Sequence, residues 1–271
     1  MKIFAIKDET DTTGKTLSWL IYYTRTKTFY IEVPNDIDSW EAPLLISSFV
    51  KRGERTLNAY WSKLWVQQRI IPQDRQNLGH VLKDNGLKEY DEFSLLMLAK
   101  GRCAQDDYVL EAIDPSVLPK ELSKRFQRKV EEVIPLSDQS LLVFFRNGLV
   151  KKCDVMPYLE DRREFAPIRT NAPLFEQAEV LPGGYGVGWG EQQTIPDSTL
   201  YQMGKTLPLQ LDDLRRFVAR RVLTTAESAE LLDCSRQNVD ALTRKAQLHP
   251  LKATSKTTLF LKSEVEQQLW K

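Results

Sequence analysis

This chain of 271 residues has few of the side chains that build metal sites and disulfide frameworks. Its three cysteines are widely spaced and odd in number, its two histidines are His80 and His249, and it has no Cys-x-x-Cys pair. Structural zinc needs clustered Cys or His ligands, and a disulfide framework needs paired cysteines. We therefore expect reduced thiols, a cytoplasmic location, and no metal or other cofactor. The cysteines are Cys103, Cys153 and Cys234.

Long apolar runs and an excess of charge of one sign are also missing. No apolar segment approaches the roughly 20 residues of a membrane-spanning helix, so we expect no membrane association. The apolar part of the N-terminus is too short for a signal peptide. With 38 Lys or Arg against 37 Asp or Glu, the formal net charge is +1. Any affinity for DNA must therefore come from local charge.

The sequence also lacks the signatures of common enzymes. The glycine-rich stretch at residues 183–190 has neither the Lys-Ser/Thr of a P-loop nor the G-x-G-x-x-G spacing of a dinucleotide fold. Its alternating Tyr185, Val187 and Trp189 predict a twisted strand with one aromatic face. No Ser-centred elbow, kinase signature or paired-carboxylate motif occurs, and Cys103 has no histidine near it in sequence. We predict no catalytic residues and no enzyme.

Apolar residues are numerous enough for two or three small cores. They make up 42% of the chain and charged residues 28%, as in ordinary globular proteins. Aromatic and β-branched runs at 17–23 and 28–33, joined by a short polar turn, predict a β-hairpin. Helices are predicted after this hairpin at residues 43–51, 75–84, 89–99 and 120–129.

A pattern of apolar residues, glycines and an Asp-x-Phe pair lies between residues 65 and 107. This pattern resembles the N-terminal accessory region of HipA-type kinases. The resemblance implies an α+β fold for residues 1–125 without catalysis, because kinase chemistry does not occur in that region. A small α+β domain with a common pair of helices is the alternative. The matching residues are Ile70, Ile71, Pro72, Leu78, Leu82, Gly86, Asp91, Phe93, Leu95, Leu96 and Gly101.

Residues 129–206 have the pattern of a β-rich module. Strands are predicted at 130–136, 141–145 and 149–155, and Asn147-Gly148 is the strongest hairpin signal in the chain. A helical stretch at 157–165, paired strands at 178–181 and 185–189, and a short helix at 198–203 follow. The segment resembles a small bacterial β-rich module of uncharacterised function, often found with a helix-turn-helix, which implies architecture and no chemistry. The residues that carry this resemblance are Leu142, Val143, Phe144, Phe145, Asn147, Gly148, Asp154, Phe175, Gly186, Trp189, Leu200 and Tyr201.

The C-terminal residues 209–271 carry the most specific pattern. Thr224 stands three residues ahead of Glu227, the spacing of a capping box, and a short helix with Ala229 and Leu232 on its inner face follows. Ser235 can cap a second helix, which runs to about residue 246 and has Val239 and Leu242 on its inner face.

A hairpin and a last helix are predicted beyond it. Extended runs at 248–251 and 257–261 flank the polar turn 252–256. Ser263 can cap the last helix, which is predicted to bury Val265 and either Leu269 or Trp270.

The order helix, turn, helix, hairpin, helix resembles the excisionase and MerR-type winged helix-turn-helix family. The resemblance rests on TTAESAELLDCSRQNVDAL and on the terminal FLKSEVEQQL. It implies that the second helix lies in the major groove of DNA and that the hairpin, or wing, touches the backbone. The chain departs from the family pattern at Asp233 and Ala246, where such modules often have glycine.

The polar residues of this segment suit contact with DNA. Arg pairs bidentately with guanine, and Asn or Gln with adenine, while a helix N-terminus can hold a phosphate. From residue 209 onward, eleven Lys or Arg stand against eight Asp or Glu. Arg215, Arg216, Arg220 and Arg221 on the preceding helix extend the basic surface. The predicted DNA-binding residues are Ser235, Arg236, Gln237, Asn238, Arg244, Lys245, Lys252 and Lys256.

The sequence thus predicts an α+β protein of three parts: an α+β domain at 1–125, a β-rich module at 129–206 and a winged helix-turn-helix at 209–271. We predict a bacterial transcription regulator that binds double-stranded DNA and senses a partner or signal through its first two domains. The alternative is an antitoxin-like adaptor whose helix-turn-helix binds a protein without DNA specificity. An unrecognised enzyme in the central domain is a weaker third. Oligomeric state and operator are not determined by the sequence.

Overall fold

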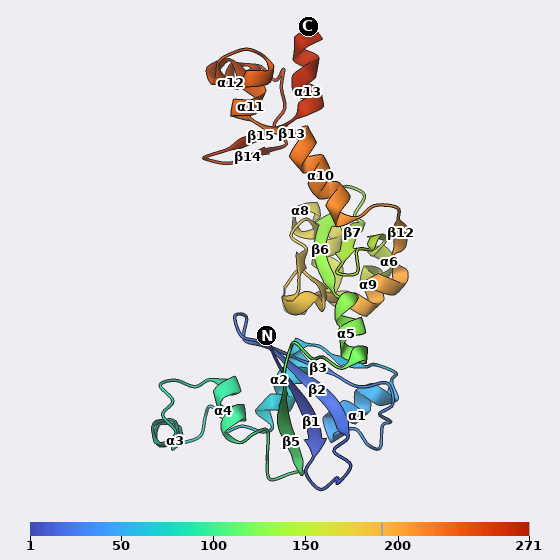
Figure 1. Ribbon diagram of the computed structural model, residues 1–271, viewed down its shortest axis with the longest axis vertical. Coiled ribbons are helices and arrows are strands. Elements are labelled where there is room, and N and C mark those ends of the chain that lie inside the picture. Colours follow the sequence, from blue (N-terminus) through green and yellow to red (C-terminus); the bar gives the residue numbers. More distant parts are fainter. Residues whose placement is uncertain (191, 271) are drawn as a thin grey trace. The chain divides into compact units, whose positions relative to one another are not determined.

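A computed structural model describes residues 1–190 and 192–270. Helices alternate with short strands that pair in antiparallel sheets, so the chain belongs to the predicted α+β class (Figure 1). It divides into two compact units, residues 1–147 with 153–204, and residues 148–152 with 205–271. The boundary predicted at 125–129 falls inside the first unit. None of the described helices is long and apolar enough to cross a bilayer.

The first unit begins with a five-stranded antiparallel sheet in the order β4-β3-β2-β1-β5. The predicted hairpin is confirmed, because Tyr23 pairs with Thr28 at the turn. Neighbouring residues of β2 enter different cores: Leu20 and Tyr22 face one, Trp19 and Ile21 the other. Both faces are therefore covered, which explains an apolar run without alternation. The strands are β1 (Lys2–Asp8), β2 (Thr16–Tyr23), β3 (Thr28–Glu32), β4 (Thr56–Leu57) and β5 (Tyr108–Ile113).

Helices α1 (Leu44–Lys51) and α2 (Ala59–Gln67) cover one face of this sheet. Phe49 of α1 and Trp65 of α2 are buried in the core between the helices and that face. Helix α1 confirms the prediction, whereas α2 was not predicted. Helix α4 (Glu92–Leu98) is capped by Asp91, which accepts from Ser94 N at 2.8 Å.

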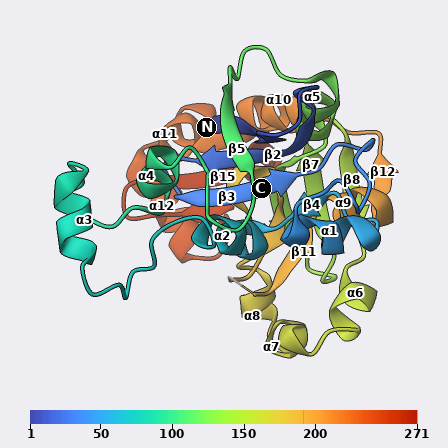
Figure 2. The same ribbon diagram turned by 90° about the horizontal axis from the view of Figure 1, so that it is seen from below.

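Helix α3 (Leu78–Asp84) begins three residues later than predicted and has no buried residue. Figures 1 and 2 both show it apart from the sheet. Its limited contacts with the core explain why apolar periodicity placed its start poorly.

Helix α5 (Lys120–Gln127) covers the other face of the sheet with Leu122 and Phe126 and leads into the central part of the unit. There the two predicted strands form as β6 (Val130–Pro135) and β7 (Leu141–Phe145), and they pair with each other. Strands β9 (Glu179–Val180), β10 (Gly186–Gly188) and β11 (Thr194–Pro196) form a separate sheet. The predicted pairing around residues 182–184 is confirmed by Val187 opposite Val180.

Short helices enclose the core of this central part. Helix α6 ends at Glu160, so the helical stretch predicted at 157–165 is broken into two pieces. Large apolar side chains, Phe145, Phe165, Phe175 and Leu200 among them, fill the core. The helices are α6 (Met156–Glu160), the 3-10 turn η1 (Arg163–Phe165), α7 (Ala166–Thr170), α8 (Ala172–Phe175), the 3-10 turn η2 (Pro182–Gly184) and α9 (Asp197–Met203).

The second unit contains the C-terminal pattern. Strand β8 (Val150–Cys153) pairs with β12 (Lys205–Leu207), and β13, β15 and β14 form a three-stranded sheet. Strand β13 was not predicted. The elements after β12 are α10 (Leu211–Arg221), β13 (Val222–Thr224), α11 (Thr225–Leu231), α12 (Arg236–Arg244), β14 (Lys252–Ala253), β15 (Thr258–Leu261), α13 (Lys262–Gln267) and the 3-10 turn η3 (Gln268–Trp270).

Two details of this unit correct the sequence prediction. The extended run predicted at 248–251 is not a strand, because Leu248 is buried in the core and pairing starts at Lys252. Ser263 does not cap the last helix, which starts at Lys262 without a side-chain cap. Val265 is buried as predicted, Leu269 is 54% exposed, and the side chain of Trp270 lies outside the described part.

Candidate nucleic-acid interface

Helix α11 starts with the predicted capping box. Thr224 Oγ1 accepts from Glu227 N at 3.3 Å, and Glu227 Oε2 accepts from Thr224 N at 2.8 Å. These reciprocal bonds satisfy two amides that a helix start leaves without partners. The hydrogen bond from the Thr224 amide lowers the pKa of the Glu227 carboxyl, so the cap is ionised at neutral pH.

The turn between α11 and α12 is built on Asp233, which has a φ of 50°. This left-handed conformation lets Cys234 N donate to Ala229 O at 2.9 Å and closes α11. Asp tolerates it better than most residues because its short polar side chain bonds locally. Ser235 then caps α12, and its hydroxyl accepts from Asn238 N at 3.3 Å.

Helix α12 also ends at a residue in the left-handed conformation. Ala246 has a φ of 52°, and Gln247 N donates to Leu242 O at 2.9 Å. Both departures from the expected glycines therefore keep a glycine-like backbone. At Ala246 no polar side chain compensates for the strain, which is about 1–2 kcal/mol for an L-residue.

Ala246→Gly is therefore expected to raise the free energy of unfolding of the second unit by about 1 kcal/mol. The free energy released when glycine removes the left-handed strain is larger than the entropic cost of ordering a glycine, which is more flexible than alanine in the unfolded chain. Unfolding in urea, monitored through amide hydrogen exchange of residues 222–265, measures the change. Ala241→Gly, in the interior of α12, is the control and should lower the same quantity by about 1 kcal/mol. Equal losses in both variants would contradict the strain at Ala246.

One small core holds these elements together. Five of its residues come from α11, α12, the segment after α12, β15 and α13, and all are at most 5% exposed. The predicted inner residue Val239 is fully buried, and Leu242 packs against the core while partly exposed. Helix α12 is thus fixed against α11 and the sheet. The five residues are Ala229, Val239, Leu248, Phe260 and Val265.

The first turn of α12 presents its polar side chains to solvent. Arg236, Gln237 and Asn238 are all exposed. In the described part of the chain, the amides of Arg236 and Gln237 have no hydrogen-bond acceptor. Free amides at a helix start, together with the positive end of the helix dipole, favour an anion.

The β14–β15 hairpin has an ordered tip. Thr254 Oγ1 accepts from Thr257 N at 3.0 Å, and Thr254 N donates to Thr257 O at 2.8 Å. Lys252 and Lys256 are exposed, and neither has an ion-pair partner within residues 1–190 and 192–270. At the far end of α12, Arg244 Nε donates to Asp240 O at 3.4 Å and Lys245 is exposed. All eight residues predicted from the sequence therefore lie on the surface of the second unit.

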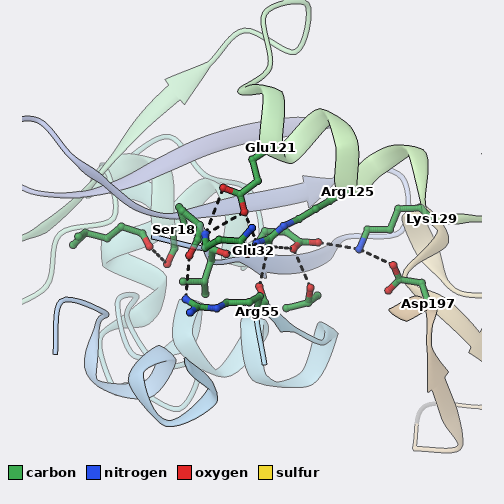
Figure 3. Close-up of polar contacts among 12 residues, drawn as sticks. Ser18, Glu32, Arg55, Glu121, Arg125, Lys129 and Asp197 are labelled. Carbon is green, nitrogen blue, oxygen red and sulfur yellow. Dashed lines mark hydrogen bonds and ion pairs between the residues drawn. The ribbon is translucent and has the colours of Figure 1, made fainter. Parts of the chain in front are cut away.

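A separate group of charges, which sequence reasoning missed, is buried in the first unit (Figure 3). Lys129 is 2% exposed, and its Nζ lies 2.9 Å from Glu32 Oε1 and 3.2 Å from Asp197 Oδ2. Arg125 Nη1 donates to Glu32 Oε2 at 2.8 Å, and the Lys129 ammonium lies 3.6 Å from the ring centre of Tyr185. We call these five residues the Lys129 cluster.

Burial and charge set the protonation of the Lys129 cluster. Burial raises the pKa of Glu32, but the charges of Lys129 and Arg125 outweigh it, so the net pKa is lowered. At Asp197 burial dominates the attraction of Lys129, and the pKa is raised. Burial also raises the pKa of Tyr185. Each cation is paired with carboxylates, as buried charges require: Lys129 with Glu32 and Asp197, and Arg125 with Glu32 and with Glu121 at the edge of the cluster.

The Lys129 cluster joins three parts of the first unit, and apart from Arg125, which is partly exposed, its charged groups are buried. It links β3, α5 and the start of α9, with Glu32 0% and Asp197 8% exposed. Its groups therefore hold one another and are closed to a substrate. Its signal in the sequence was a carboxylate inside an apolar strand, TFYIEV, whose partner could be identified only in three dimensions.

The other side chains that could serve in catalysis or metal binding are engaged in contacts that stabilise the fold. Within the described ranges, no group of three His, Cys, Asp or Glu side chains is placed to hold a metal ion. Cys103 Sγ accepts from Arg69 Nη1 at 3.1 Å, and the same guanidinium donates to Asp106 at 2.5 Å. The buried Arg69 thus ties the loop that carries Cys103 to α2.

Comparisons of this chain with protein-family models, curated proteins and solved structures found no match.

Proposed function

We propose that the second unit is a winged helix-turn-helix domain that binds double-stranded DNA, and that the chain is a transcription regulator. The observation that carries this proposal is the exposed first turn of α12. Among the residues that the structure describes, the side chains of Arg236, Gln237 and Asn238 have no competing partners, and the neighbouring amides of Arg236 and Gln237 are free to bind an anion. These are the side chains that form bidentate bonds with base edges.

The size of α12 suits the major groove. A helix with its side chains is about 10–12 Å across, and the major groove, about 12 Å wide, admits it; the nine residues of α12 extend about 13 Å along the groove. The shared core fixes its inner face, so only its outer face and first turn can meet DNA. In helix-turn-helix proteins the N-terminal residues of the second helix contact the bases.

The β14–β15 hairpin is proposed as the wing. Lys252 and Lys256 are exposed there, and Thr254 orders the turn that presents Lys256. Point charges on an exposed hairpin suit phosphate contacts, which position a protein without reading sequence. The proposal assigns no catalytic step to the chain.

A partner-binding role for the first unit is supported by its surface. Trp40 is 88% exposed, Leu44 91% and Tyr60 67%. Burying such side chains against another protein removes apolar surface from water, which is favourable. This surface also supports the second candidate function, an adaptor that binds a protein and reads no DNA sequence.

Mutants of α12 and of the hairpin are expected to fail in different ways. Arg236→Ala or Gln237→Ala should lose about 1–3 kcal/mol on a preferred duplex and little on random DNA, because base contacts carry the sequence preference. Lys252→Ala or Lys256→Ala should weaken both equally and make the salt slope shallower by about one unit each. Binding curves at two salt concentrations, on a selected and a scrambled duplex, measure both effects.

Folding is the control for this comparison. All four side chains are exposed, so circular dichroism and thermal unfolding should match the parent chain. Parent-like DNA binding by all four variants would refute the DNA-reading role and favour the adaptor.

A further inference from the structure

Helix α10 leaves apolar side chains partly exposed. Of its eleven residues none is buried. Phe217 is 50% and Val218 48% exposed, while Leu211 and Leu214 are half-buried. The spacing of Leu211, Leu214 and Val218 is i, i+3 and i+7, so they form one stripe, and Phe217 flanks it. An amphipathic helix is usually stabilised by burying such a stripe.

The charges of α10 are separated along its axis. Asp212 and Asp213 lie in its first turn and Arg220 and Arg221 in its last. Asp212 pairs with Arg216 at 2.8 Å. Among the residues that the structure describes, Arg220 and Arg221 have no ion-pair partner. One end of the helix is thus acidic and the other basic.

We propose that α10 is the dimerisation element of this protein and that its occupant is α10 of a second copy, in antiparallel orientation. Antiparallel pairing lays stripe against stripe and puts the acidic turn of each copy beside the basic turn of the other. A surface that is complementary to itself after a twofold rotation is what a symmetric dimer requires. A parallel pair would set like charges together.

The same charge pattern also stabilises a single helix through its macrodipole. That effect acts within one chain, so it cannot depend on the charges of a second chain. Experiments that exchange charges between two chains therefore separate dimerisation from helix stability.

The association of the full chain tests the proposal without DNA. The contact area of two short helices is small, so we expect a dissociation constant on the order of micromolar by sedimentation equilibrium. Phe217→Ser should raise that constant about a hundredfold, because the dimer loses burial of two rings. Leu251→Ser, at another exposed apolar residue of the same unit, should leave it unchanged.

A charge exchange provides the second measurement. One chain carries Arg220→Glu and Arg221→Glu, and the other carries Asp212→Lys and Asp213→Lys. Each should be monomeric alone, and their mixture should form heterodimers with restored complementarity at both ends. Asp213→Lys also removes a cap bond to Gln210 N, so circular dichroism must show that the helix content is kept.

The proposal would be overturned if the parent chain stayed monomeric at protein concentrations about a hundred times the expected dissociation constant. A dimer whose dissociation constant is unchanged by Phe217→Ser would overturn it as well. Failure of the charge-exchanged chains to associate would refute the antiparallel arrangement. The inference does not rest on DNA binding, since every measurement is made without DNA. Arg236→Ala should leave the dimer intact, so the failure of either idea can be told from the failure of the other.

Discussion

Lys129→Met is expected to lower the free energy of unfolding of the first unit by about 3–5 kcal/mol. The substitution removes a buried cation and leaves Asp197, 8% exposed, without its neutralising partner. Arg125 still bonds Glu32, so the loss centres on the Lys129 side of the cluster. Urea unfolding of the full chain measures the change.

Two further variants identify the cause of that loss. Lys124→Met, in helix α5 just before Lys129, is the control, because Lys124 is exposed and its loss should change stability by about 0.5 kcal/mol or less. The triple variant Lys129→Met, Glu32→Gln, Asp197→Asn removes the uncompensated charges and should recover part of the stability. A triple variant that is no more stable than Lys129→Met would show that packing, not charge, accounts for the loss.

Phe260→Ala should destabilise the second unit by about 3–5 kcal/mol and leave the first unit unaffected. Phe260 is fully buried on β15, in the core that fixes α12. Since a small domain is stable by only several kcal/mol, much of the second unit should open. Hydrogen exchange on the full chain should show faster exchange in residues 222–265 and unchanged protection in β1 to β3.

Leu251→Ala is the matched control for Phe260→Ala. Leu251 is 52% exposed in the same unit, so its truncation should change stability by about 0.5 kcal/mol or less. Loss of protection in both units of the Phe260→Ala chain would contradict their independence. If DNA binding is lost together with the protection of α12, the second unit is the part that binds.

Elements with strong local signals were predicted well. The capping box at Thr224, the Ser235 cap and the β2–β3 hairpin all formed where the sequence placed them. Caps and tight turns depend mainly on neighbouring residues, so short-range interactions fixed these three, although the cap predicted at Ser263 did not form. Strands β1 and β5 and helix α2 were missed, because their places depend on partners far away in the chain.

The proposed DNA-binding residues follow a similar division. Their exposure on α12 and on the hairpin could be anticipated, because they flank apolar residues with helical and extended spacing. The first strand of the hairpin begins at Lys252 and not at Leu248 as predicted, because Leu248 is buried in the core. Apolar periodicity alone does not distinguish a buried residue outside a strand from one within it.

The sequence by itself therefore determined the α+β class, the helix caps at Thr224 and Ser235 and the surface residues proposed to contact DNA. Only the tertiary structure decided which charges are buried together and which apolar stripe stays partly exposed. Glu32, Lys129 and Asp197 are far apart in the chain, and they meet only because β3, α5 and α9 pack into one unit. Burial and long-range pairing depend on the whole fold, whereas caps and turns depend on residues within a few positions of one another.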